Sequence, residues 1–352
     1  MPSDPRKEIH GLPAALHETL EKGRPEYERL IRQMRWGELP VYFLGRGPAL
    51  AVGLSGALAC ETLLEWPAVV HTPEDFNAYC LPLLRPRSVL WFISTGKESP
   101  ETLEVAKAAR ARGATVLALV ESPQNPVAQE SDGIFLVRSG QDLGKGISVA
   151  VCQAAAVNFI VFLMARALKR SSAKFDTLED EFAKLPDHLT WVFTQLSQAM
   201  GSLAEELTAQ EEVTLLTGGC YYPVAVHAAS LLSRLGGVRT EAVNATAVLP
   251  SAMASLARLQ TLLVISSSRL RVKKQVHEAV ESAKRSGARI LSLTDANDPE
   301  VSRRSAFSLL LPGLSEMTGA TMAHAVLAWV ASQCLHQGKR ALGRAARPEP
   351  AP

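Results

Sequence analysis

The stretch Gly113-Ala-Thr-Val-Leu-Ala-Leu119 recurs in the second half of the chain as Gly287-Ala-Arg-Ile-Leu-Ser-Leu293. In both copies a glycine, typical of the end of a helix, comes directly before a short apolar run. A nearly constant spacing of roughly 172 to 174 residues relates further positions along the chain. These pairs are Val41 and Val213, Ser94 and Ser266, and Gly140 and Gly313. The sequence therefore predicts a duplicated domain.

Each half of this repeat contains four short apolar runs that do not alternate with polar residues, the pattern of parallel strands buried on both faces. The runs lie at residues 41–44, 88–93, 115–120 and 133–137, and again at 213–216, 261–265, 289–293 and 307–311. Amphipathic segments such as residues 100–112 separate them and predict helices. Strands that alternate with helices predict an α/β fold in which each domain is a parallel sheet flanked by helices, a three-layer α/β/α arrangement.

The runs also suggest where the domains begin and end. We expect an N-terminal helical segment at residues 1–35, a first domain at 36–184, a second domain at 185–338 and a disordered tail at 339–352. The boundary rests on the charged segment 169–183 and on Leu185-Pro-Asp-His188, which we interpret as a break. The tail is rich in Arg, Ala and Pro and contributes no core.

Composition excludes several classes of protein. The 352 residues include 37 Lys and Arg against 35 Asp and Glu, and the basic residues are scattered, so we expect no nucleic-acid partner. The most apolar stretch, residues 149–168, is interrupted by Gln153 and Asn158 and predicts a buried helix rather than a membrane span. The first six residues are polar, and no signal-peptide core follows them.

The spacing of cysteines and histidines indicates no metal site. The five cysteines form no CxxC pair and the eight histidines form no HExxH pattern, so we expect neither a metal nor a cofactor. An odd number of cysteines in a chain without an export signal predicts reduced thiols and a cytoplasmic protein.

Ligands of open parallel sheets bind at the carboxyl ends of strands, so the residues there carry the functional prediction. The first run ends in Gly45-Arg-Gly-Pro48, where glycines let backbone N–H groups approach an anion. The second ends in Ser94-Thr-Gly-Lys-Glu-Ser99, directly before Pro100, which makes Ser99 the predicted helix N-cap. These hydroxyls could serve only as caps. Capping needs one hydroxyl, however, and this loop supplies three together with a lysine, which favours phosphate binding.

These motifs resemble those of the double-SIS family, which includes the isomerase half of glutamine–fructose-6-phosphate aminotransferase, amino-sugar-phosphate deaminases and fructosamine deglycases. Phe43-Leu-Gly-Arg-Gly47 is similar to the family's first strand and glycine turn, and residues 91–102 are similar to its hydroxyl-rich phosphate loop. The resemblance extends over most of the chain. It implies two tandem SIS domains that bind a phosphorylated sugar.

The predicted phosphate-binding residues follow from this match and from the strand ends. They are Gly45, Gly47, Ser94, Thr95, Gly96, Lys97, Ser99 and Thr102. Where the family has a central serine this chain has Gly96, and we expect Lys97 to supply charge in place of the lost hydroxyl. The second half has a similar rim, formed by Gly219, Ser266, Ser267 and Ser268.

The family's catalytic positions are not matched. The glutamate that moves a proton in the isomerases falls on Arg234, and the segment with the ring-opening histidine falls on Leu249-Pro-Ser251. Arginine stays protonated and cannot act as the base. The candidate catalytic residues are Glu98 and Asp75, with Glu241, Glu316 and His227 as further acid–base alternatives.

Two classes of function stay open. The first is an enzyme, either an aldose–ketose isomerase or a deaminase or deglycase, that acts on a ketose or amino-sugar 6-phosphate. The second is a non-catalytic phosphosugar-binding sensor or regulator. The resemblance implies a homodimer. The chain begins Met1-Pro2, without the N-terminal cysteine of a glutaminase, so we expect no complete glutamine amidotransferase activity.

Overall fold

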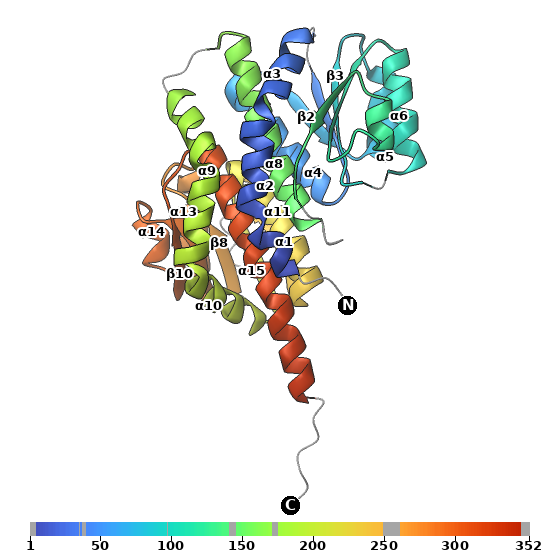
Figure 1. Ribbon diagram of the computed structural model, residues 1–352. Coiled ribbons are helices and arrows are strands. Elements are labelled where there is room, and N and C mark those ends of the chain that lie inside the picture. Colours follow the sequence, from blue (N-terminus) through green and yellow to red (C-terminus); the bar gives the residue numbers. More distant parts are fainter. Residues whose placement is uncertain are drawn as a thin grey trace, which may run out of the picture. The chain divides into compact units, whose positions relative to one another are not determined.

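The computed structural model describes residues 5–34, 36, 40–96, 98–140, 146–170, 175–248 and 261–345, with side chains described between residues 7 and 335. The chain forms two compact units, each with one five-stranded sheet (Figure 1). The first unit comprises His10–Asp187. The second begins at His188 and includes Pro5–Ile9.

The two sheets have the same strand order. The first is ordered β2-β1-β3-β4-β5 and contains β1 (Val41–Leu44), β2 (Ala68–His71), β3 (Val89–Ile93), β4 (Thr115–Val120) and β5 (Gly133–Leu136). The second is ordered β7-β6-β8-β9-β10 and contains β6 (Glu212–Thr217), β7 (Arg239–Asn244), β8 (Thr261–Ile265), β9 (Arg289–Asp295) and β10 (Phe307–Leu311). Every neighbouring pair is parallel. The predicted α/β fold with two parallel sheets is confirmed.

The sequence prediction finds eight of these strands and misses β2 and β7, which form one edge of each sheet. β2 is partly exposed, and 39% of Val69 is accessible to solvent. β7 mixes polar and apolar residues, as in Arg-Thr-Glu-Ala-Val-Asn. An edge strand with one exposed face needs no continuous apolar run, so neither segment carries the pattern of a fully buried strand.

Helices precede and follow the strands in both units. They are α1 (Pro5–His10), α2 (Leu12–His17), α3 (Arg24–Gln33), α4 (Pro48–Ala59), α5 (Pro73–Asp75), α6 (Pro100–Ala111), α7 (Pro126–Gln129), α8 (Ile147–Ala167), α9 (Phe175–Gln195), α10 (Ser197–Thr208), α11 (Tyr222–Leu231), α13 (Lys273–Arg285), α14 (Pro299–Ser302) and α15 (Glu316–Ala345). Short π-helical turns at Glu18–Lys22, Cys60–Leu64, Phe76–Cys80 and Leu232–Gly236 extend four of them, and 3₁₀ turns lie at Leu81–Leu83 and Gly219–Tyr221.

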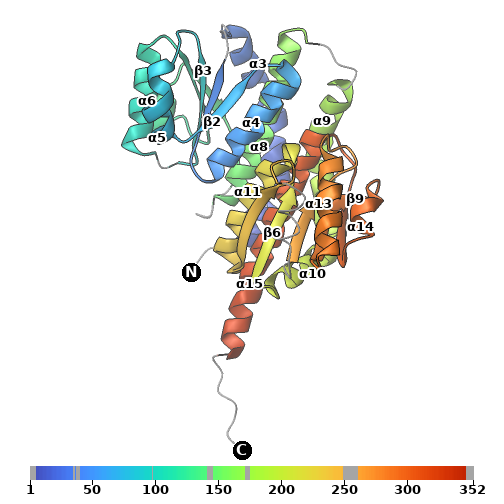
Figure 2. The ribbon, with the colours of Figure 1, turned by 180° about the vertical axis from the view of Figure 1, so that it is seen from behind.

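Both faces of the first sheet are packed against helices. On one face Phe43, Trp91 and Phe135 stack, with ring centroids 6.0 and 4.9 Å apart, beneath α3, α4 and α8. On the other face Phe92 packs into an apolar cluster with Val105 of α6. All five residues of β3 are buried, which accounts for its lack of alternation. In the second unit α13 and α14 pack together, as do α10, α11 and α15 (Figure 2).

Helix α8 has the length and hydropathy of a membrane span, the one such helix found among the described residues. Its apolar window is entirely buried inside the first unit. Gln153, one of the polar residues that interrupt it, donates hydrogen bonds to the backbone carbonyls of Ser94 at 2.6 Å and Leu119 at 3.2 Å. The helix therefore packs as the core helix that the sequence predicts.

The helix does not end at the break expected at Leu185-Pro-Asp-His188, because α9 continues through Pro186. A proline in a helix interior removes one backbone hydrogen bond. Here a buried apolar stripe at Leu178, Phe182, Leu185 and Leu189 follows helical spacing, and its packing keeps the segment helical. The division between the units falls after Asp187, inside this helix.

Part of the segment expected to be disordered is helical. Helix α15 extends to Ala345, so residues 339–345 are helical. This segment contains Ala, Arg, Leu and Lys, which are strong helix formers, and these propensities outweigh its glycine. Residues 346–352 lie outside the described residues.

Gly56 of α4 sits where the helix approaches the sheet closely. A Cβ atom there would lie 2.6 Å from the Phe43 ring and 2.8 Å from Cγ2 of Val157. We expect Gly56→Ala to lower the free energy of unfolding by about 1–3 kcal/mol, because overpacking displaces side chains from their rotamers. Urea denaturation measures the change. Ser55→Ala on the same helix is the control and should shift stability by no more than about 0.5 kcal/mol. Equal stability of the two variants would contradict the close approach.

Candidate functional site

The strand order of the first unit reverses between β1 and β3, the kind of position at which parallel sheets form a crevice. β1 and β3 are neighbours, and the chain continues from them into α4 and α6, which lie on opposite faces of the sheet. Open parallel sheets bind ligands at such a reversal of strand order, beyond the carboxyl ends of the two strands. The loops found there are residues 45–47 and 94–99, the two stretches that the sequence predicts.

Arg46 joins these two loops. Its Nη2 atom donates a hydrogen bond to the Ser99 hydroxyl at 2.8 Å, and its Nε atom donates to Glu74 Oε2 at 3.0 Å. The sequence prediction names the glycines on either side, Gly45 and Gly47, but not Arg46. The sequence feature that could have identified Arg46 is its position between two glycines at the end of a strand.

A second carboxylate lies beside Arg46. Glu101 Oε2 is 3.9 Å from Nη2 of Arg46. Hydrogen bonds from its own backbone N–H and from the Ser99 hydroxyl lower the pKa of Glu101, and the charge of Arg46 lowers it further. The guanidinium is therefore held at the rim by the anions Glu74 and Glu101.

The second loop ends in the predicted helix cap. Ser99 accepts a hydrogen bond from the N–H of Thr102 at 3.3 Å, and α6 begins at Pro100, so the cap is confirmed. The Thr102 hydroxyl is buried, 3.2 Å from that of Ser99. Gly96 has a φ of +118°, a conformation that favours glycine, and Thr95 beside it is exposed. Capping thus accounts for the Ser99 hydroxyl but not for the loop's other two hydroxyl groups, those of Ser94 and Thr95.

Ser94 is buried at the carboxyl end of β3, where its hydroxyl oxygen accepts two hydrogen bonds. The donors are the N–H of Gly96 at 3.2 Å and Nδ2 of Asn125 at 2.7 Å. The Asn125 amide is oriented by a second contact, because its Oδ1 caps α7 by accepting the N–H of Val127 at 2.9 Å. Within the described residues no acceptor is found for the Ser94 hydroxyl proton. That proton is available to an anion in the crevice.

The second unit has a carboxylate where the first has this amide. Ser266 follows β8 as Ser94 follows β3, and its hydroxyl donates to Asp298 Oδ2 at 2.7 Å. Asp298 directly precedes α14, as Asn125 directly precedes α7. The Asp298 carboxylate accepts the hydrogen bond of the serine hydroxyl and adds a buried negative charge, and both effects disfavour a phosphate there.

The other serines of the second rim are also used within the protein. Ser268 donates its N–H and its hydroxyl to Asp295 Oδ2, at 2.7 and 3.1 Å. The Ser267 hydroxyl accepts the N–H of Arg269 at 3.1 Å. The predicted donors therefore serve a carboxylate or a turn of the protein itself.

Gly219, the remaining residue predicted for the second rim, lies beside a third carboxylate. Its φ is +54°, and a Cβ atom there would lie 2.5 Å from Glu316 Oε1. The same oxygen accepts the N–H of Cys220 at 3.3 Å, and Arg271 Nε is 3.7 Å from the other carboxylate oxygen. Glu316 thus fills the position at the start of α11 that an external anion would take.

The two predicted catalytic residues have different surroundings. Asp75 is exposed in the first turn of α5, and its carboxylate accepts a hydrogen bond from the hydroxyl of Thr72 at 2.9 Å as part of the helix cap. Glu98 is half-buried in the loop before α6. Glu98 is therefore a neighbour in sequence of the predicted phosphate residues. The described contact of the Asp75 carboxylate is structural, within the helix cap.

The remaining predicted positions are spread over the chain. Arg234, which stands where the family has its glutamate, is exposed in the second unit, and Glu241 accepts a hydrogen bond from the Thr214 hydroxyl at 3.2 Å. Lys97 and Pro250 lie outside the described residues.

No three His, Cys, Asp or Glu side chains gather as metal ligands within the described ranges. None of the five cysteines, all of which lie in described segments, forms a disulfide bond, and burial raises the pKa of Cys60, Cys220 and Cys334. Thiols of this kind stay protonated at neutral pH and are poor nucleophiles. Their role in the structure is packing.

Two histidines face each other in the core of the second unit. Nδ1 of His227 lies 2.5 Å from Nε2 of His324, and the rings are nearly perpendicular. Burial lowers the pKa of His227 to about 4, helped by the charge of Arg234. Burial also lowers the pKa of His324 well below its usual value. Both rings are therefore neutral at pH 7, and one N–H is shared between them.

Comparison with known proteins gives a family match in the first unit and more distant relatives over most of the chain. The SIS domain model matches residues 39–166, which span the whole first sheet. The chain is 25% identical over 274 residues to glutamine–fructose-6-phosphate aminotransferase (isomerizing) of Rhizobium meliloti, covering 77% of this chain and 45% of that protein. The protein of the same name from Thermococcus kodakarensis is 24% identical over 313 residues, covering 88% and 51%. The chain spans about half the length of these curated relatives.

Solved structures share the fold over nearly the whole chain. The C-terminal domain of glucosamine-fructose-6-phosphate aminotransferase from Francisella tularensis matches with a TM-score of 0.83 at 15% identity, covering 96% of this chain and 97% of that one. Tagatose-6-phosphate ketose/aldose isomerase from Escherichia coli matches with a TM-score of 0.75 at 16% identity, covering 96% and 93%. At these identities the likeness establishes the fold.

Fold and crevice together define the class of protein, an α/β protein with two tandem SIS-type sheets. The SIS domain model matches residues 39–166, which lie in the first unit. The resemblance to SIS domain proteins expected from the sequence is therefore confirmed.

The buried histidine pair predicts a loss of stability in acid. A histidine of the unfolded chain titrates near pH 6.5, whereas His227 in the folded chain titrates at about pH 4. Its contribution to stability is fully present above pH 6.5. As the pH falls from 6.5 to 4 the unfolded chain binds protons that the folded chain excludes, so the free energy of unfolding falls by up to about 1.4 kcal/mol per pH unit for each histidine. Urea denaturation across this range measures the slope.

A double variant tests the assignment. His227→Gln combined with His324→Gln should flatten the acid slope, whatever its effect on stability at neutral pH. His17→Gln, at an exposed position of α2, controls for the loss of a histidine. An acid slope as steep in the double variant as in the parent protein would show that other groups cause it.

Proposed function

We propose that the chain binds a phosphorylated sugar in the β1/β3 crevice of the first unit, with the phosphate on the loop that ends at Thr102. The observation that carries the proposal is the Ser94–Asn125 hydrogen bond, in which a neutral amide donates to the serine and leaves its proton for an anion. The N-terminus of α6 adds the positive end of a helix dipole. Relatives named for fructose 6-phosphate and tagatose 6-phosphate support a sugar phosphate as the ligand class.

Arg46 supplies the cation of the proposed site. A guanidinium binds phosphate and carboxylate oxygens in the same bidentate geometry, so a phosphate can replace Glu74 or Glu101 as its partner. The other predicted contacts, Gly45, Gly47, Thr95, Gly96, Lys97 and Ser99, surround the same place and remain part of the proposal. The phosphate is then anchored by donors from both loops.

As an enzyme, the protein would act on a ketose or amino-sugar 6-phosphate as an aldose–ketose isomerase, deaminase or deglycase. This chemistry requires a base that moves a proton between adjacent sugar carbons. Glu98 is the proposed base, because it is half-buried and lies within the phosphate loop, directly before Ser99. We further propose that the protein is cytoplasmic and works as a homodimer, as the family resemblance implies.

The second candidate function is a non-catalytic phosphosugar sensor. Two observations favour it. An exposed arginine, Arg234, stands where the isomerases have their glutamate, and the Asp75 carboxylate is engaged in a helix cap. Under this function the crevice retains the phosphate contacts and lacks proton transfer.

Exchanging the two buried partners tests the phosphate site. Asn125→Asp gives the first unit the arrangement of the second, because an aspartate still caps α7 but accepts the Ser94 proton and repels a phosphate. The dissociation constant for fructose 6-phosphate should rise roughly 10- to 100-fold, since a hydrogen bond to a charged group contributes about 1.5–3 kcal/mol. Isothermal titration calorimetry measures it.

Asp298→Asn is the matched control in the second unit and should leave this dissociation constant unchanged. If both exchanges weaken binding equally, or if neither does, the assignment of the phosphate to the first unit is wrong.

Turnover separates the enzyme from the sensor. We expect new phosphorus NMR resonances when the protein is incubated with fructose 6-phosphate, glucosamine 6-phosphate or a fructosamine 6-phosphate, and we expect Glu98→Gln to abolish them while leaving binding intact. Asp75→Asn, in the exposed cap, is the control and should keep its activity. Shifted or broadened resonances without products would favour the sensor.

A further inference from the structure

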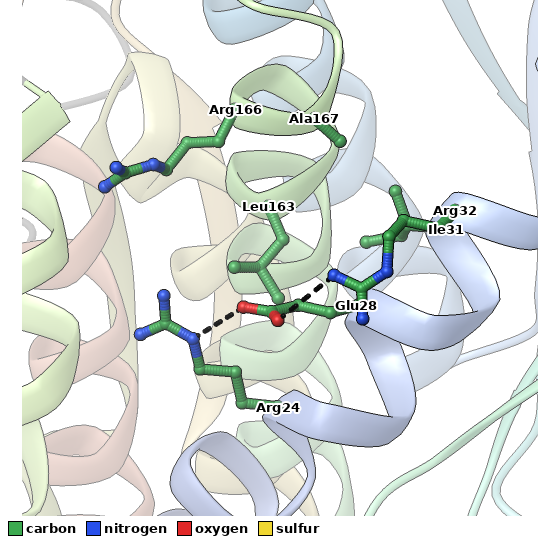
Figure 3. Close-up of a pocket in the computed structure, with 7 residues that line it drawn as sticks. All are labelled: Arg24, Glu28, Ile31, Arg32, Leu163, Arg166 and Ala167. Atoms are coloured by element: carbon green, nitrogen blue, oxygen red, sulfur yellow. Dashed lines mark hydrogen bonds and ion pairs between the residues drawn. The ribbon is translucent and has the colours of Figure 1, made fainter.

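A pocket of about 320 Å³ lies between α3 and α8 of the first unit (Figure 3). Charged side chains of α3 line one side, and Leu163, Arg166 and Ala167 of α8 line the other. Pockets that hold small molecules begin at roughly this size.

The pocket is remote from the proposed sugar-phosphate crevice. Gln153, in the second turn of α8, bonds the carbonyls at the carboxyl ends of β3 and β4. Leu163 lies ten residues further along the helix, about 15 Å away at 1.5 Å per residue. The pocket is therefore near the opposite edge of the sheet, and a ligand bound there would occupy a second site.

The charges at the pocket alternate along a chain of ion pairs. Arg32 Nη1 lies 3.5 Å from Glu28 Oε2, and Arg24 Nε donates to Glu28 Oε1 at 2.8 Å (Figure 3). Arg24 Nη2 donates to Glu179 of α9 at 2.7 Å, and Arg166 pairs with the other oxygen of Glu179. Three guanidinium groups share two carboxylates, which leaves one net positive charge.

The guanidinium groups at the two ends of this chain are only partly used. Arg32 and Arg166 each contact one carboxylate through Nη1, and no partner is found for their other N–H groups among the described residues. An arginine has five N–H donors. The Arg32 side chain is 66% exposed and that of Arg166 43%, so these donors can reach a ligand.

Apolar groups complete the pocket. Ile31 of α3 is buried and contributes to the lining with Leu163 and Ala167. The guanidinium of Arg166 lies 6.0 Å from the centre of the Phe162 ring, which steadies its position. Ion pairs that only stabilised α3 would need neither a cavity nor an apolar floor, because pairs four residues apart act on the helix surface.

We propose that this pocket binds a small phosphate monoester, with the phosphoryl group on the guanidinium of Arg32 and the organic part on the floor of Ile31, Leu163 and Ala167. The net positive charge of the cluster attracts a phosphoryl group, and the unused donors of Arg32 fit it because a guanidinium binds phosphate bidentately. Free inorganic phosphate shares the phosphoryl chemistry but leaves the apolar floor uncovered. The proposal does not depend on the function of the β1/β3 crevice.

Isothermal titration calorimetry with phenyl phosphate tests the site. The full chain carrying Asn125→Asp serves as the parent, so that binding in the crevice is weakened. Arg32→Glu should raise the dissociation constant more than tenfold, because it reverses the net charge of the cluster at an exposed position. Arg29→Glu, an exposed residue of the same helix outside the pocket, makes the same change of charge and should alter binding less than twofold.

The outcomes are separable. Absence of binding to the parent, or equal weakening by Arg32→Glu and Arg29→Glu, overturns the site, provided that unliganded thermal midpoints show both variants folded. Inorganic phosphate binding as tightly as phenyl phosphate overturns the monoester assignment. If the proposed function of the crevice is wrong, Asn125→Asp and the unmodified chain give the same titration, while the comparison of Arg32→Glu with Arg29→Glu still decides the pocket.

Discussion

Each sheet has a buried serine at the carboxyl end of its central strand, and the hydroxyl of that serine must have a partner, because a buried polar group without one costs about 1–3 kcal/mol. The partner comes from the residue that begins the next short helix, Asn125 in the first unit and Asp298 in the second. The resulting hydrogen bond joins the loop after the central strand to the start of that short helix. It therefore fixes the position of the backbone that faces the crevice. Much of the local geometry at the strand ends depends on it.

The chemistry of the partner decides what the crevice can hold. An amide donates to the serine, remains neutral and leaves the serine proton free, whereas a carboxylate accepts that proton and brings a charge. Two more carboxylates of the second unit disfavour an external anion, because Asp295 and Glu316 accept hydrogen bonds from backbone N–H groups that such an anion would need. One fold can thus form an anion site in one copy and satisfy the same donors internally in the other, with few changes in side chains.

The sequence predicts the parts of this structure that depend on local pattern. Strands buried on both faces can be predicted because their apolar residues do not alternate with polar ones. The cap at Ser99 can be predicted because its hydrogen-bond partner is only three residues away in sequence. The partnership of Ser94 with Asn125 spans 31 residues and depends on how two loops meet, so the order of residue types does not reveal it. For the same reason the sequence does not identify Arg46 as the residue that joins the two loops, and it does not predict the helix through Pro186 because packing outweighs local propensity there.

Helix α8 links the two proposed anion sites of the first unit. Its N-terminal half holds the carbonyls beneath the crevice through Gln153, and its C-terminal half forms a wall of the arginine pocket. Its apolar window is fully buried, and close-packed interiors transmit displacements rather than absorbing them. A ligand in the pocket would change affinity in the crevice only if it bound one packed position of α8 better than another, because a ligand without such a preference shifts no equilibrium. The helix therefore supplies the physical connection that coupling requires, and the difference in affinity between its positions sets the strength of that coupling.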